Sequence, residues 1–243
     1  MPLTFKKLIL YFSTPVFLFK KQRLLDVQPR LRTWLVFGPM DSGKTTFVKT
    51  VLYYQNQLLD EYGISYRDIQ FFDVESFVKG LANNWKTTVL NLFIDDAVFL
   101  ADSRASMTKN NQILTQTYFY IRHYVEHYSR QVRLINVFWS AQSVTAIDKR
   151  IRDTATVIIL KGMVRGSEKV LREYFFPSII NKMQLFQIMS VIDDKYKSYF
   201  AVSLQKRYSE LMRYKAKPEV RLEQYGVRPE FKLRDLLMSN GGE

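Results

Sequence analysis

Short apolar runs alternate along the chain with segments in which apolar residues recur every three or four positions. The runs predict strands, and all but one of the five are almost continuously apolar, as is typical of strands covered on both faces. We place these strands at Leu31–Phe37, Ile69–Asp73, Val89–Asp95, Val132–Trp139 and Thr156–Leu160. The alternation predicts an α/β fold, in which a mostly parallel sheet carries helices on both faces.

A long helix is predicted between the third and fourth strands, from about Thr108 to Ser129. Apolar and aromatic residues spaced four and three positions apart would form its buried stripe. The stripe comprises Leu114, Tyr118, Ile121, Val125 and Tyr128.

Beyond the fifth strand the pattern changes to helices and one further strand. We expect a helix that ends at Phe176, a break at Pro177, and another helix near Ile179–Met189. Residues 197–202 alternate polar and apolar side chains, which predicts an added antiparallel strand. From Lys206 onward the chain is basic and contains Pro and Gly, so we interpret it as a tail.

Residues 38–45 read Gly-Pro-Met-Asp-Ser-Gly-Lys-Thr and match the phosphate-binding motif G-x-x-x-x-G-K-[ST] in full. A predicted strand precedes the motif and a helical segment follows it, so backbone N–H groups would form a phosphate cradle. Lys44 would reach the β- and γ-phosphates, and the Thr45 hydroxyl would bind Mg²⁺. The predicted cofactors are ATP and Mg²⁺, and the nucleotide-binding residues are Gly38, Pro39, Met40, Asp41, Ser42, Gly43, Lys44, Thr45 and Thr46.

Asp41 is unusual inside such a loop. A carboxylate that pointed inward would repel the triphosphate, so we expect Asp41 to face solvent or a neighbouring subunit.

Hydrolysis requires a metal anchor and a group that positions water. The apolar third strand ends in Asp95 and Asp96, which predicts Asp95 as an Mg²⁺ ligand and Asp96 as the residue that orients or deprotonates water. The spacing between Lys44 and Asp95 places the Asp95 strand near the first strand, with another element inserted between the two. The fourth strand, beside that of Asp95, ends near Gln142, our candidate sensor of the γ-phosphate.

We divide the chain into a basic N-terminal extension (1–30), a P-loop ATPase domain (31–204) and a basic C-terminal tail (205–243), and we expect the end of the tail to be disordered. Hydrophobic residues make up 47% of the 243 positions, which excludes global disorder. The absence of cysteine excludes disulfides and thiolate metal sites. The net charge of +13 favours a polyanionic partner, either nucleic acid or a membrane surface.

The motifs together resemble the FtsK–HerA superfamily of DNA-pumping ATPases over about residues 31–204. The resemblance rests on the complete phosphate loop, the Asp95-Asp96 pair, the strand tip Ser140-Ala141-Gln142 and the stretch Ile147–Arg152. It implies a RecA-like (ASCE) P-loop NTPase fold and a ring homo-oligomer, a hexamer, acting on double-stranded DNA. The small size is similar to that of viral genome-packaging ATPases, which implies the host cytoplasm and a capsid or portal partner. Asp96 departs from the Glu that is commoner there.

In such rings a neighbouring subunit supplies an arginine finger, which stabilises charge in the transition state. Our candidates are Arg150 and Arg152, followed by Arg104.

Two other P-loop classes are alternatives: an AAA+-like initiator or helicase loader, and a membrane-associated phage-morphogenesis ATPase of the zonular occludens toxin type. The first would place a helical lid after the fifth strand. The second would use the apolar run Leu8–Phe19, which is too short to span a bilayer, so we expect a membrane role to be the weaker option. His123-Tyr124-Val125-Glu126-His127 matches a zinc-peptidase motif, which we interpret as a surface pair.

Overall fold

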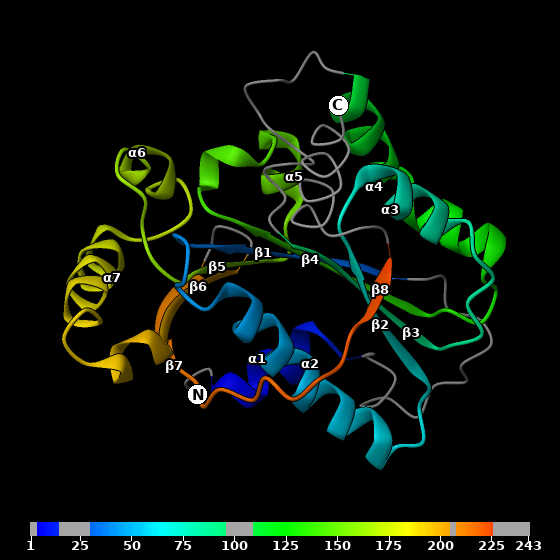
Figure 1. Ribbon diagram of the computed structural model, residues 1–243, viewed down its shortest axis with the longest axis horizontal. Coiled ribbons are helices and arrows are strands. Elements are labelled where there is room, and N and C mark those ends of the chain that lie inside the picture. The colour runs from blue at the N-terminus through cyan, green and yellow to red at the C-terminus, as the bar shows by residue number, and fades with distance from the viewer. Residues whose placement is uncertain (1–3, 15–29, 96–108, 205–207, 226–243) are drawn as a thin grey trace, which may run out of the picture.

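The computed structural model describes residues 4–14, 30–95, 109–204 and 208–225. These residues form a three-layer sandwich, with one eight-stranded sheet between two layers of helices (Figure 1). The strand order is β7-β6-β5-β1-β4-β3-β2-β8. The predicted α/β architecture is confirmed.

The strands are β1 (Arg30–Phe37), β2 (Tyr66–Phe71), β3 (Val89–Ile94), β4 (Leu134–Ala141), β5 (Val157–Leu160), β6 (Tyr199–Leu204), β7 (Tyr208–Arg213) and β8 (Glu223–Tyr225). The helices are α1 (Phe5–Phe12), α2 (Lys44–Glu61), α3 (Val74–Leu81), α4 (Lys109–Tyr128), α5 (Lys149–Thr154), α6 (Glu168–Leu171) and α7 (Pro177–Met189), with 3₁₀ turns η5 (Val144–Ala146) and η6 (Asp194–Ser198).

The order of the central strands sets the geometry of the site. β4 lies between β1 and β3 and is parallel to both, so one strand separates the phosphate loop from the strand that ends before Asp95. This is the inserted element that the sequence predicted. β6 pairs antiparallel with β5, as predicted, and continues the sheet where an AAA+ protein would place a helical lid.

Alternating residues of β1 face two hydrophobic cores. Trp34 and Val36 pack with α1 and α2, whereas Leu35 and Phe37 pack with α3, α4 and α7 on the other side. Figure 1 shows the same division, with α1 and α2 on one face of the sheet and α3, α4 and α5 on the other. Both faces of the central strands are therefore shielded from solvent, which explains their almost continuous apolar sequence.

The stripe of α4 agrees with the prediction only in part. Tyr118, Ile121 and Val125 are buried, but Tyr128 is 43% exposed. Ser129 takes the buried position instead: its hydroxyl donates to the Asn83 carbonyl and accepts from the Trp85 N–H. The end of the helix is therefore held by hydrogen bonds of a buried hydroxyl rather than by apolar packing. The side chain of Leu114 lies outside the described residues.

The expected boundaries of the central domain do not separate it from its flanks. In α1, Leu8 and Ile9 are fully buried in the core beneath α2. After residue 204, β7 pairs antiparallel with β6, and β8 then pairs with β2 at the opposite edge of the sheet. β7 and β8 are thus strands of the sheet, although the sequence placed them in a tail. No described helix is long and apolar enough to cross a bilayer.

A row of buried polar side chains crosses the face of the sheet beneath α1 and α2. Asp68, Asn91, Asn136 and Arg32 are aligned across β2, β3, β4 and β1. Asn91 donates to Asp68 Oδ1 at 2.7 Å, and Asn136 donates to Asn91 Oδ1 at 2.7 Å. Arg32 and Asn136 also donate to carbonyls just after α1. The row therefore ties the N-terminal helix to four strands.

Candidate active site

The phosphate loop follows β1 and leads directly into α2. The Gly38 N–H donates to the Ala141 carbonyl at 3.2 Å, which fixes the start of the loop against the tip of β4. A Cβ on Gly38 would lie 2.4 Å from Ser42 Oγ, and Gly43 has a φ of +82°. The close approach of Ser42 therefore favours glycine at position 38, and the left-handed backbone favours glycine at position 43. Asp41 also has a positive φ, 59°, and is exposed.

Lys44 curves back over the loop. Its ammonium donates to the carbonyls of Gly38 (2.9 Å) and Pro39 (2.8 Å). Lys44 is also the first residue of α2, so the N-terminus of an 18-residue helix points at the same place. A positive charge and a helix N-terminus that converge on a loop of backbone N–H groups form an anion site.

Asp95 brings the loop and the neighbouring strands together. The hydroxyl of Thr45 lies 3.1 Å from Asp95 Oδ2 and 3.3 Å from Oδ1. Ser140, at the end of β4, donates to Oδ1 at 2.5 Å, and Gln70, at the end of β2, donates to Oδ2 at 3.3 Å. The carboxylate is therefore held in one orientation from two strands while it faces the phosphate loop.

The residues fit the predicted Mg²⁺. Mg²⁺ in nucleotide sites is bound through one or two carboxylates, the substrate phosphates and water, rather than by an all-protein cage. The Thr45 hydroxyl and the Asp95 carboxylate supply such a set beside the phosphate loop. Where the structure describes the chain, no cluster of three His, Cys, Asp or Glu residues forms another metal site, and His123 and His127 lie exposed on α4.

The remaining predicted site residues lie at different distances from this centre. Gln142 is half-buried directly after β4, next to the start of the phosphate loop. Thr46 lies in the first turn of α2. Asp96 and Arg104 lie outside the described residues, so their roles stay predictions.

The two arginines of α5 have opposite environments. The side chain of Arg150 is 64% exposed and pairs with Asp148 at 3.0 Å, which raises the pKa of the arginine and lowers that of the carboxyl. Arg152 is 9% exposed, and its buried Nε and Nη1 atoms have no hydrogen-bond partner within the described part of the chain. Arg150 can therefore reach another molecule, whereas Arg152 cannot do so without disrupting the packing around it.

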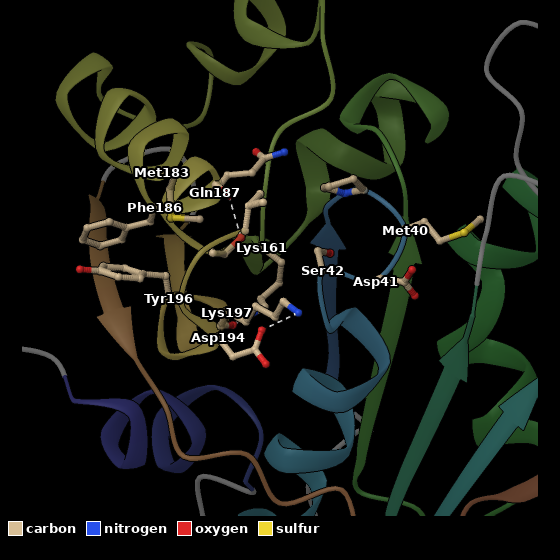
Figure 2. Close-up of a pocket in the computed structure, with 13 residues that line it drawn as sticks. Met40, Asp41, Ser42, Lys161, Met183, Phe186, Gln187, Asp194, Tyr196 and Lys197 are labelled. Atoms are coloured by element: carbon tan, nitrogen blue, oxygen red, sulfur yellow. Dashed lines mark hydrogen bonds and ion pairs between the residues drawn. The ribbon is translucent and has the colours of Figure 1, made fainter.

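A cleft of about 350 Å³ opens between the phosphate loop and the α7–η6 region (Figure 2). Pro39, Met40, Asp41 and Ser42 line it from the loop, and Phe186, Gln187 and Tyr196 are among the residues on the opposite side. Lys161, the first residue after β5, lies between the two walls. The cleft places space for the rest of a nucleotide beside its phosphates.

Three site residues were missed in the sequence: Gln70, Ser140 and Lys161. Ser140 belongs to the strand tip that we singled out, and its position next to the loop could have marked it. Gln70 lies one residue before the end of β2, and no motif in the sequence distinguishes it from the other polar residues of that strand. Lys161 follows β5 immediately, in the same position as the polar residues after β3 and β4, and this repetition was the signal available.

Comparisons with known proteins give similarity in structure only. No protein-family model and no curated protein matches the sequence. The DNA-packaging ATPase from Sulfolobus Turreted Icosahedral Virus is similar at 16% identity and a TM-score of 0.41, with 78% of this chain and 98% of that chain covered. The genome packaging NTPase from Sulfolobus turreted icosahedral virus 2 has 14% identity, a TM-score of 0.47 and coverage of 78% and 97%.

The N-terminal domain of zonular occludens toxin from Neisseria meningitidis is also similar, at 13% identity and a TM-score of 0.39, with 77% and 95% covered. At such identities and TM-scores these similarities carry no conclusion about function. The function rests instead on the geometry of this chain's own site: a phosphate loop, a carboxylate oriented toward it and an adjoining cleft.

Proposed function

We propose that this protein is an ATP-hydrolysing motor of the FtsK–HerA type that moves double-stranded DNA as a ring of identical subunits. The contact between Thr45 and Asp95 carries the ATPase part of the proposal. It joins the phosphate loop to a carboxylate from a strand that is not adjacent to β1, which is the arrangement needed to hold Mg²⁺ against the β- and γ-phosphates.

Each residue has a defined task in this proposal. The loop amides and Lys44 bind the phosphates, and Thr45 and Asp95 hold Mg²⁺, which when bound neutralises charge on the phosphates. Ser140 and Gln70 orient the Asp95 carboxylate. Asp96 would orient or deprotonate water, Gln142 would sense the γ-phosphate, and Arg150 would complete the site of a neighbouring subunit.

The DNA part of the proposal is supported by the net charge of +13 and by the resemblance of the motifs to DNA-pumping ATPases. Packaging of a viral genome, a hexameric ring, a capsid or portal partner and a place in the host cytoplasm belong to the same proposal. The similar viral proteins are themselves a DNA-packaging ATPase and a genome packaging NTPase.

Two structural observations weigh against the alternatives. The antiparallel pairing of β6 with β5 occupies the place of an AAA+ lid. The membrane-associated alternative needs the apolar N-terminal segment at a bilayer, but its described part, α1, buries Leu8 and Ile9 in the core.

The deciding experiment measures ATP turnover with and without duplex DNA, together with the mass of the assembled particle. We expect DNA to stimulate turnover, a ring mass, and DNA binding that weakens steeply as salt rises. Lys44→Ala should abolish turnover and leave the fold intact, as judged by circular dichroism. Unchanged turnover in this variant would overturn the ATPase assignment, and a flat response to salt would overturn the DNA assignment.

A further inference from the structure

Lys161 runs along the phosphate loop from its first glycine to its last. Its backbone N–H donates to the Phe37 carbonyl at 2.7 Å, so it begins level with the start of the loop. A Cβ on Gly38 would lie 3.1 Å from Lys161 Cβ, and a Cβ on Gly43 would lie 4.0 Å from Lys161 Cε. The ammonium is thereby carried to the end of the loop where α2 begins. Only 6% of the residue is exposed.

The partners of the Lys161 ammonium are all neutral. It donates to the carbonyls of Lys197 (2.6 Å) and Tyr199 (3.2 Å), and it lies 4.5 Å from the centroid of the Tyr214 ring. Among the described residues no carboxylate pairs with it. A buried cation without a counter-ion is costly, and a methionine of similar length would avoid that cost.

The charged and titratable groups around Lys161 do not neutralise its positive charge. Asp41 of the loop is exposed, and Asp194 of η6 pairs with Lys197 at 2.8 Å. Burial raises the pKa of the neighbouring Tyr214 to about 12, so this phenol stays neutral. Lys44 adds a second positive charge near the phosphate loop. Burial also lowers the pKa of Lys161 to about 7. The missing negative charge is therefore expected from a ligand.

The cleft shows where that ligand would lie. Lys161 and Ser42 both line it, and the buried Ser42 hydroxyl has no hydrogen-bond partner among the residues that the structure describes. Figure 2 shows Lys161 between the phosphate loop and the residues of α7 and η6. An uncompensated ammonium and an unpaired hydroxyl at the wall of an anion-binding loop fit a nucleoside di- or triphosphate.

We propose that Lys161 is a second lysine of the phosphate site, one that attracts the nucleotide phosphates from the β5 side of the loop and takes up a proton when the nucleotide binds. This inference rests on the proposed nucleotide-binding function. Lys161 acts through its charge, as a positioning residue, and Tyr214 with the two carbonyls keeps the ammonium in place. Tyr214 directly follows β7, so the segment after this strand would act on the proposed nucleotide site through its contact with Lys161.

Calorimetry of ADP binding in two buffers of different ionisation enthalpy tests the proton uptake. A bound anion stabilises the charged form of lysine, so uptake should be small at pH 6, where Lys161 is already protonated, and approach about one proton at pH 8. At pH 8 the nucleotide phosphates are already fully ionised and contribute no proton. ADP excludes any contribution from turnover.

Lys161→Met removes the charge and keeps the length of the side chain. We expect it to weaken ADP binding about tenfold at pH 6 and to abolish the uptake at pH 8. Lys197→Met is the matched control, since it removes one positive charge from the same cleft but from a side chain that is 53% exposed. Its uptake should equal that of the unmodified protein.

The possible outcomes separate the two proposals. Failure of the unmodified protein to bind ADP or ATP would overturn the proposed function itself. Binding without uptake at pH 8, or uptake that persists in Lys161→Met, would overturn the role of Lys161 and leave the function standing. If Lys161→Met does not fold, the pH series on the unmodified protein still decides.

Discussion

The hydroxyl of Thr45 lies 3.1 Å from Oδ2 of Asp95, although 50 residues separate them in the chain. Thr45 lies in the first turn of α2, and Asp95 follows β3 directly. The contact exists because β4 spaces β1 and β3 so that the helix after β1 meets the end of β3. A hydroxyl and a carboxylate from different elements are thus in place beside the phosphate loop.

Asp95→Asn should lower ATP turnover at least about 100-fold, because the amide keeps the shape of the carboxylate but loses the charge that would hold Mg²⁺ in the proposed site. Binding of ADP in the presence of a chelator should change little. Steady-state turnover and equilibrium titration measure the two effects. Ser140→Ala is the control: it removes one hydrogen bond to the carboxylate and should reduce turnover much less. Equal losses in both variants would contradict a metal role for Asp95.

The central part of this site could be predicted because its signals are local. Gly38, Gly43 and Lys44 belong to one continuous motif, and Asp95 directly follows an apolar strand. Carboxyl ends of neighbouring parallel strands meet at one edge of the sheet, so residues placed there come together whatever their separation in sequence.

The parts that were missed depend on long-range packing. β8 has only three residues, and it pairs with β2 after an extended crossing from β7 at the other edge. Neither hydrophobic alternation nor a turn signal marks such a strand. The position of Lys161 after β5 could be noticed in the sequence, but its burial could not, because the ammonium is held by carbonyls of η6 and β6 and by the ring of Tyr214.

Asn91→Ala should lower the free energy of unfolding by about 3 kcal/mol, because it leaves buried polar groups without partners. Asn91 donates to Gln55 Oε1 at 2.8 Å and to Asp68 Oδ1 at 2.7 Å, and it accepts from Asn136. Urea unfolding followed by circular dichroism measures the loss. Gln57→Ala, on the solvent side of α2, should stay within about 0.5 kcal/mol. A similar small change in Asn91→Ala would show that water replaces the lost bonds.

Asp68 should make stability fall as pH rises. Burial raises its pKa, against the opposing effect of hydrogen bonds from Asn56 and Asn91. A raised pKa in the folded state means that the stabilisation is complete below the unfolded value near 4 and is lost as pH rises through the folded value. Asp68→Asn should therefore gain stability relative to the unmodified protein between pH 4 and pH 7 in urea titrations.

Glu75→Gln is the control for this pH dependence, because it removes a carboxylate that is 76% exposed on α3. Its stability should follow that of the unmodified protein at every pH. A constant difference between Asp68→Asn and the unmodified protein across this range would show that Asp68 keeps the same charge when the protein unfolds.

Arg150→Ala should reduce turnover about 1,000-fold and leave ATP binding intact, if Arg150 completes the site of a neighbour. The decisive measurement is the ATP turnover of a mixture of two variants. Lys44→Ala subunits have a defective loop but an intact Arg150, so adding them to Arg150→Ala subunits should restore part of the activity. No recovery in the mixture would place the function of Arg150 within its own subunit.

Arg152→Met should leave turnover unchanged and maintain or raise stability. The guanidinium of Arg152 is buried, and two of its nitrogen atoms have no partner among the described residues. An apolar side chain of similar length removes that cost. Thermal unfolding and steady-state turnover check the two statements. A loss of turnover in a stable variant would instead return Arg152 to the list of catalytic candidates.

Asp41→Asn should tighten ATP binding several-fold. Asp41 lies exposed in the phosphate loop at a φ of 59°, where asparagine is tolerated as well as aspartate. The substitution therefore removes a negative charge near the phosphates without altering the loop, and the gain should shrink as salt screens the repulsion. Titration of ATP at low and high salt measures both.

Asp41→Ala separates charge from backbone strain, since it also removes the carboxylate but places alanine in an unfavourable conformation. Weaker binding by Asp41→Asn would mean that the carboxylate assists the nucleotide, through a metal ion or a neighbouring subunit, rather than repelling it.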